Sequence, residues 1–335
     1  MMRVFLIAAW VAMFGLGGLA EGLIEGMNVA AWWHGRYGSQ GARESLRELR
    51  DVGVEWIAIV VTCYQESLDS PVIRCPETTR TPGLAAVRGL IRTARSLGFK
   101  VLLKPHLDID DDTWRGLIDF GDDEDAWGAW FRAYTAFILR YARLAQEEAV
   151  DMFCIGVELG GTVRRARDWR EVIRTVRETY SGPLVYAANW RGEMWRVPFW
   201  YELDYIGIDA YYPLTGRFSP ALGELVAAWR GPLRSTGCLA MREGKPVIFT
   251  EIGYRSLDGA LREPWNWAST GAPDPEEQAL GYRAFFEAVW GKPPWFAGAF
   301  FWHWELDPAA GGPMDTGYTP QNKPAEDILR AHFRG

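Results

Sequence analysis

Eight apolar segments recur along this chain, and most are followed by a polar turn and then a segment with helical periodicity. The apolar segments are continuous rather than alternating, which is typical of parallel strands that are covered on both faces. The predicted strands are 22–30, 54–62, 100–107, 152–159, 184–188, 205–210, 247–252 and 297–303. Eight such units in one chain of 335 residues predict an α/β protein with a (β/α)8 TIM barrel as a single domain.

Helical periodicity fills most gaps between these strands. A helix over 42–52 is expected to stop at Gly53, and the next is expected to open at Thr81 and Pro82 as cap and first-turn proline and to close at Gly98. Further helices are predicted over 125–148, 168–180, 222–230, 275–290 and 324–333. The connection 190–203 has only weak helical character.

A doubly wound open sheet is the competing fold. Such a sheet usually carries a glycine-rich phosphate loop after its first strand. Here the first strand runs into Asn28-Val29-Ala30-Ala31-Trp32-Trp33, which contains no glycine. The barrel is therefore favoured, and no cofactor is predicted.

The first twenty residues form a separate segment. Arg3 provides a positive start, 4–16 is almost wholly apolar, and Gly18-Leu19-Ala20 is a small-residue cleavage site. This pattern predicts a secretion signal over 1–20 and a catalytic domain over 21–335, with export to the medium or periplasm. An uncleaved anchor is the alternative, although the apolar stretch is short for a membrane span.

Net charge limits the possible partners of the protein, and the positions of the cysteines limit the possible disulfides and metal sites. The formal net charge of −7 and the pI of about 5.3 argue against nucleic acid or an anionic membrane surface as a partner. Cys63 and Cys75 fall in one predicted loop region, where a disulfide and two free thiols are both possible. Cys154 lies in an apolar strand and is expected in the core, Cys238 has no evident partner, and no cysteine spacing resembles a metal site.

Two predicted strands end in a glutamate. Glu158 closes 152–159, the fourth strand, and Glu251 lies in 247–252, the seventh. The C-terminal ends of barrel strands form the active face, so these carboxylates are expected to face one another across the barrel mouth. A salt bridge would explain either glutamate alone, but two carboxylates in this arrangement are typical of glycoside hydrolysis.

Tryptophans gather at the same strand ends. The chain has 18 tryptophans, and several follow predicted strands: Trp32, Trp33, Trp190, Trp265, Trp267, Trp302 and Trp304. An indole offers a flat apolar face with an N–H at its edge, which suits the C–H face of a sugar ring. Core packing is the alternative role, and it is the one expected for Trp130 and Trp229 on helices.

Four segments together resemble glycoside hydrolase family 113. They are Ile155-Gly156-Val157-Glu158-Leu159, Tyr186-Ala187-Ala188-Asn189-Trp190, Asp204-Tyr205-Ile206-Gly207-Ile208-Asp209-Ala210-Tyr211-Tyr212-Pro213 and Thr250-Glu251-Ile252-Gly253-Tyr254-Arg255-Ser256. The similarity runs from about residue 26 to residue 325. It implies a retaining (β/α)8 enzyme of a family known mainly for β-mannanases.

The resemblance also implies roles for individual residues. Glu158 would be the acid/base and Glu251 the nucleophile. Sugar contacts are implied for Lys104, His106, Asn189, Trp190, Tyr211 and Trp302, and the aromatic pattern adds Trp32. The wider clan commonly has asparagine before the acid/base, where this chain has Val157, so Asn189 or His106 is expected to contact the sugar 2-hydroxyl instead.

For some of these residues a structural role is the alternative to a contact with the sugar. Tyr211 and Tyr212 are adjacent, so in extended chain only one of them is expected to face the mouth. Asp209 is expected to accept hydrogen bonds from a lysine or arginine inside the protein, and Lys104 is expected to pair with Asp209 or with Glu158. For His106, which follows Pro105 at a strand end, the alternative to a sugar contact is a hydrogen-bonded structural histidine.

Three other functions remain open from the sequence. The first is a related retaining enzyme that acts on a glucan, xylan or other β-linked chain, and the second is a sugar-binding barrel without activity. The third is a metal-dependent hydrolase using His106, Asp209 and His303, although no metal-ligand spacing supports it. We therefore predict a secreted endo-β-1,4-mannanase that takes an oligo- or polysaccharide substrate and uses no metal. Oligomeric state is not predicted.

Overall fold

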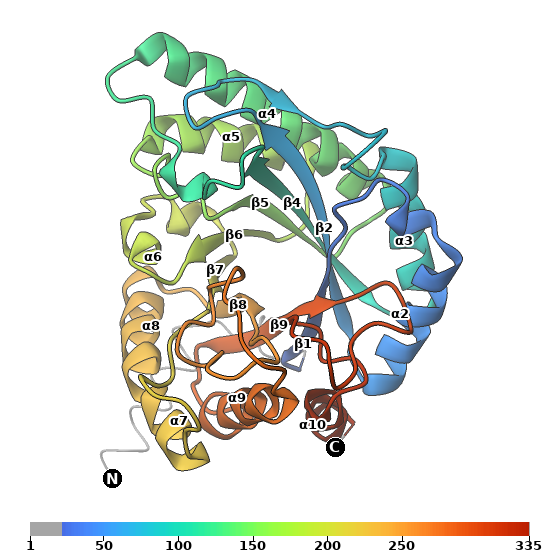
Figure 1. The fold of residues 1–335 in the computed structure, drawn as a ribbon. Coiled ribbons are helices and arrows are strands. Elements are labelled where there is room, and N and C mark those ends of the chain that lie inside the picture. The colour runs from blue at the N-terminus through green and yellow to red at the C-terminus, as the bar shows by residue number, and fades with distance from the viewer. Residues whose placement is uncertain (1–21, 335) are drawn as a thin grey trace.

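The computed structural model describes residues 22–334 and shows a closed barrel of eight parallel strands surrounded by helices (Figure 1). Around the barrel the strands follow the order β1-β9-β8-β7-β6-β5-β4-β2, and the pairing of β1 with β2 closes it. The strands are β1 (Ile24–Val29), β2 (Trp56–Gln65), β4 (Lys100–Ile109), β5 (Met152–Val157), β6 (Leu184–Asn189), β7 (Tyr205–Asp209), β8 (Val247–Ile252) and β9 (Phe296–Trp304). All eight predicted strands are confirmed, and the short β3 (Ile73–Arg74) adds an antiparallel pairing to the end of β2. The proposed secretion signal, 1–20, lies outside the described residues.

Helices follow most strands, as the periodicity predicts. They are α2 (Gln40–Val52), α3 (Leu84–Ser96), α4 (Glu124–Glu147), α5 (Ala166–Thr179), α6 (Glu193–Arg196), α7 (Leu222–Ala228), α8 (Arg230–Glu243), α9 (Pro275–Ala288) and α10 (Pro324–Phe333). Ser39 caps α2 by accepting from the backbone N–H of Ala42, and Gly53 ends it with a φ of 107°. Within residues 22–334, no helix combines the length and the apolarity that crossing a membrane requires.

Two helix predictions were wrong. The N-cap of α3 is Gly83 rather than Thr81, because the buried Thr81 hydroxyl instead donates to the carbonyl of Thr62, 2.7 Å away. The predicted helix 222–230 corresponds to α7, and no helix is predicted over α8, which contains Gly231 and Pro232. In the structure Pro232 lies in the first helical turn, where its missing N–H has no intrahelical partner to lose.

The core has two parts, separated by the barrel wall. Inside the barrel, buried side chains from the strands pack below the active face. They include Ile24, Trp56, Ala58, Leu102, Met152, Cys154, Val157, Val185, Ala187, Ile248 and Phe300. The second and larger part fills the layer between the strands and the surrounding helices. Cys154 is thus a core residue, as expected, and this continuous packing makes the strand ends a rigid frame.

A disulfide closes the loop that follows β2. Cys63 in β2 is bonded to Cys75 just after β3, so the structure decides between the two possibilities that the sequence left open. The loop also bonds to its neighbours, because Arg74 and Arg80 pair with Asp110 and the carbonyl of Thr79 accepts from the backbone of His34. Cys154 and Cys238 are the free thiols of the part described.

We expect Cys75→Ser to lower the free energy of unfolding by about 3 kcal/mol, because the disulfide closes a loop with a sequence separation of 12 residues. The measurement is a denaturant titration of both proteins without reducing agent. Cys238→Ser is the matched control, since it changes an exposed free thiol. Equal midpoints for Cys75→Ser and wild type would contradict this prediction.

Candidate active site

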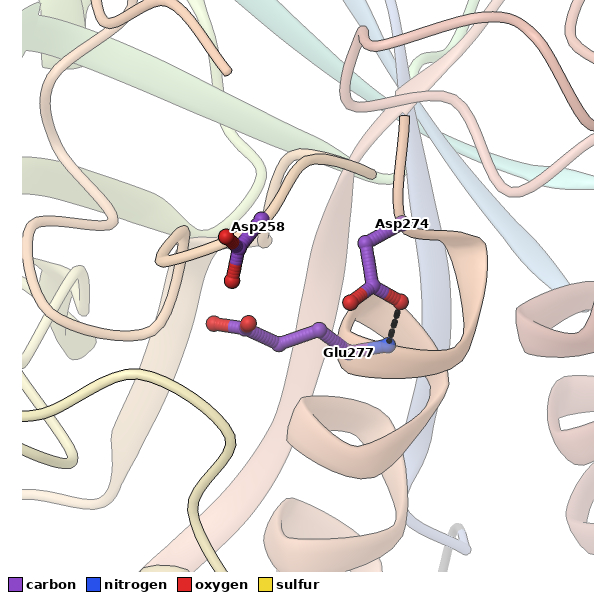
Figure 2. Close-up of side chains that lie close together, drawn as sticks. All are labelled: Asp258, Asp274 and Glu277. Atoms are coloured by element: carbon purple, nitrogen blue, oxygen red, sulfur yellow. Dashed lines mark hydrogen bonds between the residues drawn. The ribbon is translucent and has the colours of Figure 1, made fainter. Parts of the chain in front are cut away.

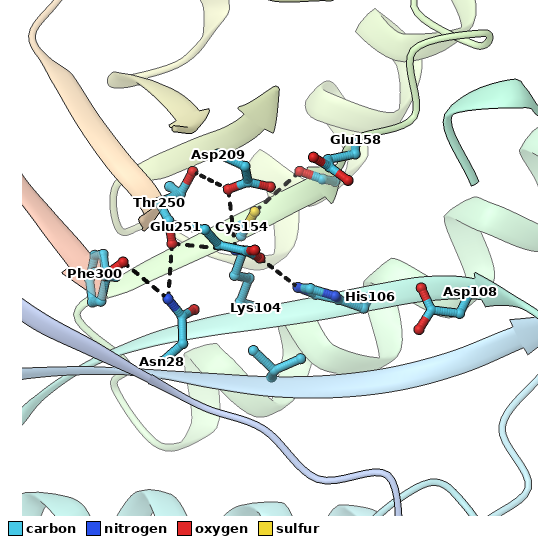
Figure 3. A network of polar contacts seen from close by, with 12 residues as sticks. Asn28, Lys104, His106, Asp108, Cys154, Glu158, Asp209, Thr250, Glu251 and Phe300 are labelled. Atoms are coloured by element: carbon cyan, nitrogen blue, oxygen red, sulfur yellow. Dashed lines mark hydrogen bonds and ion pairs between the residues drawn. The ribbon is translucent and has the colours of Figure 1, made fainter. Parts of the chain in front are cut away.

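The C-terminal ends of the barrel strands carry a connected group of polar side chains (Figure 3). Lys104 and His106 come from β4, Asp209 from β7 and Glu251 from β8, while Glu158 directly follows β5. All five are buried. Register shifts interrupt the β5–β6, β7–β8 and β8–β9 pairings next to the two glutamates. Such bulges re-aim side chains, which explains how both glutamates leave the regular inward-outward alternation.

Both oxygens of Glu251 accept hydrogen bonds. The Lys104 ammonium donates to Oε1 at 2.5 Å, and the Tyr211 hydroxyl donates to Oε2 at 2.8 Å. Tyr212 points the other way and packs on Trp190 and Trp229, as its adjacency to Tyr211 predicts. Glu251 is therefore held at two points, by an ammonium and by a hydroxyl donor.

Lys104 lies between two carboxylates at the base of the site. Its Nζ is 2.5 Å from Glu251 and 3.5 Å from Asp209, and the side chain is fully buried. Burial alone would lower the pKa of Lys104, but the charges of Asp209 and Glu251 outweigh burial and raise it. Burial and the nearby Glu251 raise the pKa of Asp209 well above its ordinary value. Lys104 thus stays protonated, as a buried counter-charge rather than an exposed sugar contact.

Glu158 is held by three side chains, one from the end of β6 and two from the segment after β4. The Asn189 amide donates to Oε1 at 2.7 Å, and the Trp114 indole donates to Oε2 at 3.1 Å. The Arg115 guanidinium lies 3.5 Å from Oε2. Glu158 has a φ of 51°, a left-handed conformation that is uncommon for a non-glycine residue and is found at functional sites.

The pKa values of His106 and Arg115 are shifted in opposite directions by their surroundings. Burial, together with the positive charges of Arg115 and Lys104, lowers the pKa of His106 well below its ordinary value. Burial would lower the pKa of Arg115 too, but Asp108 and Glu158 outweigh burial and raise it. His106 is therefore a neutral ring, with Nε2 3.8 Å from Glu251 and its face stacked on Trp302.

Two pairs of tryptophans come from the segments around this group. Trp32 meets Trp302 edge-on with ring centroids 6.3 Å apart, and the Trp302 ring lies 5.9 Å from the Lys104 Nζ. Trp190, which follows Asn189 in the chain, packs against Trp265 with centroids 5.5 Å apart. Trp32 and Trp265 are exposed, as are Trp33, Trp114 and Trp267. Trp304 does not share this position, because it is buried and its indole donates to Ser45.

Gly253 is required where β8 leaves the site. A Cβ at this position would collide with the backbone carbonyl of Trp302. The absence of a side chain lets the chain after Glu251 pass directly beside Trp302, so that both residues reach the same end of the barrel.

The loops after β8 and β9 are joined by buried and half-buried polar contacts. Arg255 donates to the carbonyls of Thr316 and Trp267, and the buried Lys323 donates to Asp315 and Ser256 at 2.6 and 2.7 Å. These contacts span both loops. They make the side of the mouth formed by 255–273 and 306–322 a single packed unit.

Three residues of the site escaped sequence reasoning: Trp114, Arg115 and Glu193. Trp114 and Arg115 lie five and six residues past the end of β4, beyond the strand ends where a barrel is expected to carry its active-site residues. Glu193 opens the short helix α6 in a connection with weak helical character. It is 1% exposed, and burial raises its pKa to about 7, although the donors Tyr186 and Asn189 oppose that shift.

A second group of acids lies where the loop after β8 leads into α9 (Figure 2). Within residues 22–334, the side chains close enough to hold a metal ion are Asp258, Asp274 and Glu277, and the rival set of His106, Asp209 and His303 does not form such a group. Asp274 caps α9 by accepting from the backbone N–H of Glu277 at 2.8 Å. Glu277 accepts from the backbones of Gly259 and Leu261. These bonds account for Asp274 and Glu277 as structural residues.

Comparisons with known proteins agree with this geometry. The model of glycoside hydrolase family 113 matches residues 30–323. A complex structure of a family 113 β-1,4-mannanase is 27% identical with a TM-score of 0.86, and covers 94% of this chain and all of its own. The family 113 β-mannanase AaManA from Alicyclobacillus acidocaldarius, in complex with ManMIm, is 31% identical with a TM-score of 0.85, over 95% and 99% of the two chains. A family 5 mannosidase from Rhizomucor miehei is 12% identical with a TM-score of 0.64, over 93% and 92%, and shares the fold alone. No curated protein matches the sequence.

We expect the contribution of His106 to the free energy of unfolding to fall as the pH drops below its ordinary pKa of 6.5, because the unfolded chain binds a proton there that the buried ring does not. His106→Gln should remove as much as about 1.4 kcal/mol of this loss for each pH unit below that value. The measurement is the free energy of unfolding at three pH values between 7.5 and 5.5, with His34→Gln as the reference substitution. Parallel pH curves for His106→Gln and wild type would contradict the prediction.

Proposed function

Since the chain belongs to glycoside hydrolase family 113, and is therefore a glycoside hydrolase, we propose that it cleaves β-1,4-linked mannan chains with retention of configuration. Glu251 is the nucleophile and Glu158 the acid/base. The observation that supports this assignment is that the two glutamates have different hydrogen-bond partners. Glu251 is bonded to an ammonium ion and a hydroxyl, whereas Glu158 lies among the loops of the mouth beside an exposed indole.

In the first step an oxygen of Glu251 bonds to the anomeric carbon, and the bond from that carbon to the glycosidic oxygen breaks. Glu158 gives its proton to the departing oxygen, so the leaving sugar departs as a neutral alcohol. Oε2 is the oxygen suited to this transfer. Its contacts with Trp114 and Arg115, at 3.1 and 3.5 Å, are longer than the 2.7 Å bond by which Asn189 holds Oε1.

In the second step water attacks the anomeric carbon, Glu158 takes a proton from that water, and the bond to Glu251 breaks. The buried charges suit the covalent state between the steps. Glu251 loses its negative charge once it is esterified, so it no longer raises the pKa of Asp209, and the Asp209 carboxylate 3.5 Å from the Lys104 Nζ becomes the counter-ion. Tyr211 stays beside the ester oxygen and can donate again as Glu251 leaves.

Mannan is proposed as the substrate because the family 113 structures that resemble this chain are named as β-mannanases. The aromatic faces of Trp32, Trp302, Trp190 and Trp265 supply flat apolar surfaces beside the catalytic group. Sugar contacts are proposed for these residues and for Asn189 and His106. The contact with the 2-hydroxyl belongs to Asn189 or His106, since Val157 is apolar and buried.

Export is proposed from the N-terminal sequence pattern and is supported by the disulfide between Cys63 and Cys75. Disulfides persist mainly outside the cytosol. We expect protein recovered from the medium or periplasm of an expressing cell to begin after Ala20. Mass spectrometry of the intact protein measures this, and an uncleaved N-terminus would contradict it.

We expect wild type to release reducing ends from mannan and glucomannan, and Glu251→Ala to lose at least a thousandfold in kcat, because a covalent route requires the nucleophile. The measurement is reducing-sugar release from mannan, glucomannan, cellulose and xylan. Proton NMR of the first product gives its anomeric configuration.

Each outcome of that assay bears on the proposal. Release from xylan or cellulose instead of mannan would refute the substrate. An inverted first product would refute the mechanism. More than about a tenth of wild-type activity in Glu251→Ala would refute the nucleophile assignment. Binding of mannan without any release would indicate a non-catalytic barrel.

Tyr211→Phe should lower kcat/KM by about 10- to 100-fold, because it removes a hydrogen bond to the charged nucleophile, a contact worth roughly 1.5–3 kcal/mol. Tyr212→Phe is the matched control. Its hydroxyl faces the core, where Thr236 and Met194 are its partners at 3.4 and 3.8 Å. Steady-state kinetics on a soluble mannooligosaccharide measure both variants. Equal effects at the two positions would contradict a role for Tyr211 at the nucleophile.

A further inference from the structure

Glu193 is a buried glutamate with no place in the two-step reaction. Its Oε1 accepts from the Tyr186 hydroxyl at 2.5 Å, and its Oε2 accepts from the backbone N–H of Asn189 at 2.9 Å. Burying a carboxylate is costly unless its oxygens are bonded, and here both are. The question is what these two bonds hold in place.

Both hydrogen-bond partners of Glu193 also bond to Glu158 or to the residue that follows it. The Tyr186 hydroxyl also accepts from the backbone N–H of Leu159 at 2.9 Å, and Leu159 directly follows Glu158 in the chain. The Asn189 side chain donates to Glu158 Oε1 at 2.7 Å. One branch therefore holds the backbone beside Glu158, and the other holds its carboxylate.

Tyr186 is itself confined by packing. Its ring lies edge-on to Trp169, Phe199 and Trp200, with centroids 5.5 to 6.0 Å apart. Gly156 lets the ring approach the strand, since a Cβ there would lie 2.8 Å from Tyr186 Cε2. The hydroxyl therefore has a single position, between Leu159 and Glu193.

Asn189 is confined as well. Its Oδ1 accepts from the backbone N–H of Arg191 at 2.8 Å, which leaves the amide nitrogen directed at Glu158. The backbone bond from Asn189 to Glu193 sets where this short turn lies. A shift of Glu193 would thus move the one side chain that bonds Glu158 Oε1.

The backbone of Glu158 needs such support. Its left-handed φ of 51° is held by a bond from its own N–H to the carbonyl of Ala187, at 2.8 Å. Strained conformations persist only where the surroundings over-determine them. The bonds through Tyr186 and Asn189 supply two further constraints.

We propose that Glu193 is the positioning residue for the acid/base, and that it aims the Glu158 carboxyl group at the glycosidic oxygen through Tyr186 and Asn189. This inference rests on the proposed function, because it takes Glu158 as the acid. A misplaced acid should slow the first step only for substrates whose leaving group needs a proton, and kcat/KM reports that step.

The test compares two substrates that differ in this need. Mannopentaose has a sugar leaving group that must be protonated, whereas 2,4-dinitrophenyl β-mannobioside releases a stable phenolate without help. Glu193→Gln has one acceptor oxygen where the carboxylate has two, so it must give up one of the two bonds. We expect kcat/KM to fall about tenfold or more for mannopentaose and less than about twofold for the dinitrophenyl substrate.

Glu277→Gln is the matched control. Glu277 is also a buried glutamate whose two oxygens accept from neighbouring donors, the backbones of Gly259 and Leu261. It has no bond to the residues around Glu158. Any general effect of removing a buried carboxylate should therefore appear in Glu277→Gln, equally for both substrates.

Tyr186→Phe provides a second variant in case Glu193→Gln does not fold. It keeps the ring and its packing but removes the hydroxyl that joins Leu159 to Glu193. The same preference for the dinitrophenyl substrate is expected, and the double variant should lose less than the product of the two single effects.

The outcomes separate the inference from the proposed function. Equal losses on both substrates, or no loss on either, in Glu193→Gln and Tyr186→Phe would overturn the positioning role. Glu158→Ala measured beside them tests the proposed function. A loss confined to mannopentaose supports Glu158 as the acid, whereas equal losses on both substrates would refute that assignment regardless of the Glu193 result.

Discussion

The buried contact between the Lys104 ammonium and Glu251 is the interaction on which the site depends. Removing two charges from water costs several kcal/mol for each ion, and a mutual attraction offsets this only with good geometry and additional hydrogen bonds. Here the additional partners are Tyr211 on Glu251 and Asp209 beside Lys104. Because these four residues come from three strands or strand ends, β4, β7 and β8, only a closed and rigid barrel can hold them together.

The second glutamate is supported by a different means. Glu158 lies in strained backbone and is held by an indole from the loop after β4, an amide at the end of β6 and a more distant guanidinium. Glu193 accepts hydrogen bonds from the Tyr186 hydroxyl and the Asn189 backbone, both in β6, and these two residues bond to Glu158 and to its neighbour Leu159. A nucleophile must stay ionised, which a strong counter-charge ensures, whereas an acid/base must gain and lose a proton and so needs accurate aim rather than a fixed charge.

Much of this site follows from local sequence patterns. Apolar runs flanked by turns located all eight strands, and the position of Glu158 and Glu251 at strand ends placed them at the active face because parallel strands end on one side. The opposed directions of Tyr211 and Tyr212 follow from the period of extended chain. The residues that sequence reasoning missed, Trp114, Arg115 and Glu193, lie in loops or in a four-residue helix, where no periodicity predicts the direction of a side chain.

The sequence by itself determined the barrel, the two glutamates and the family resemblance, because these depend on the order and spacing of residue types. The tertiary structure alone decided that Cys63 meets Cys75, that Lys104 is buried against Glu251 rather than exposed to a sugar, and that Trp304 faces the core while Trp32 faces the mouth. It also revealed the connection from Glu193 to Glu158. Each of these depends on which side chains meet across separate strands and loops, and such distances are set by the packing of the whole barrel.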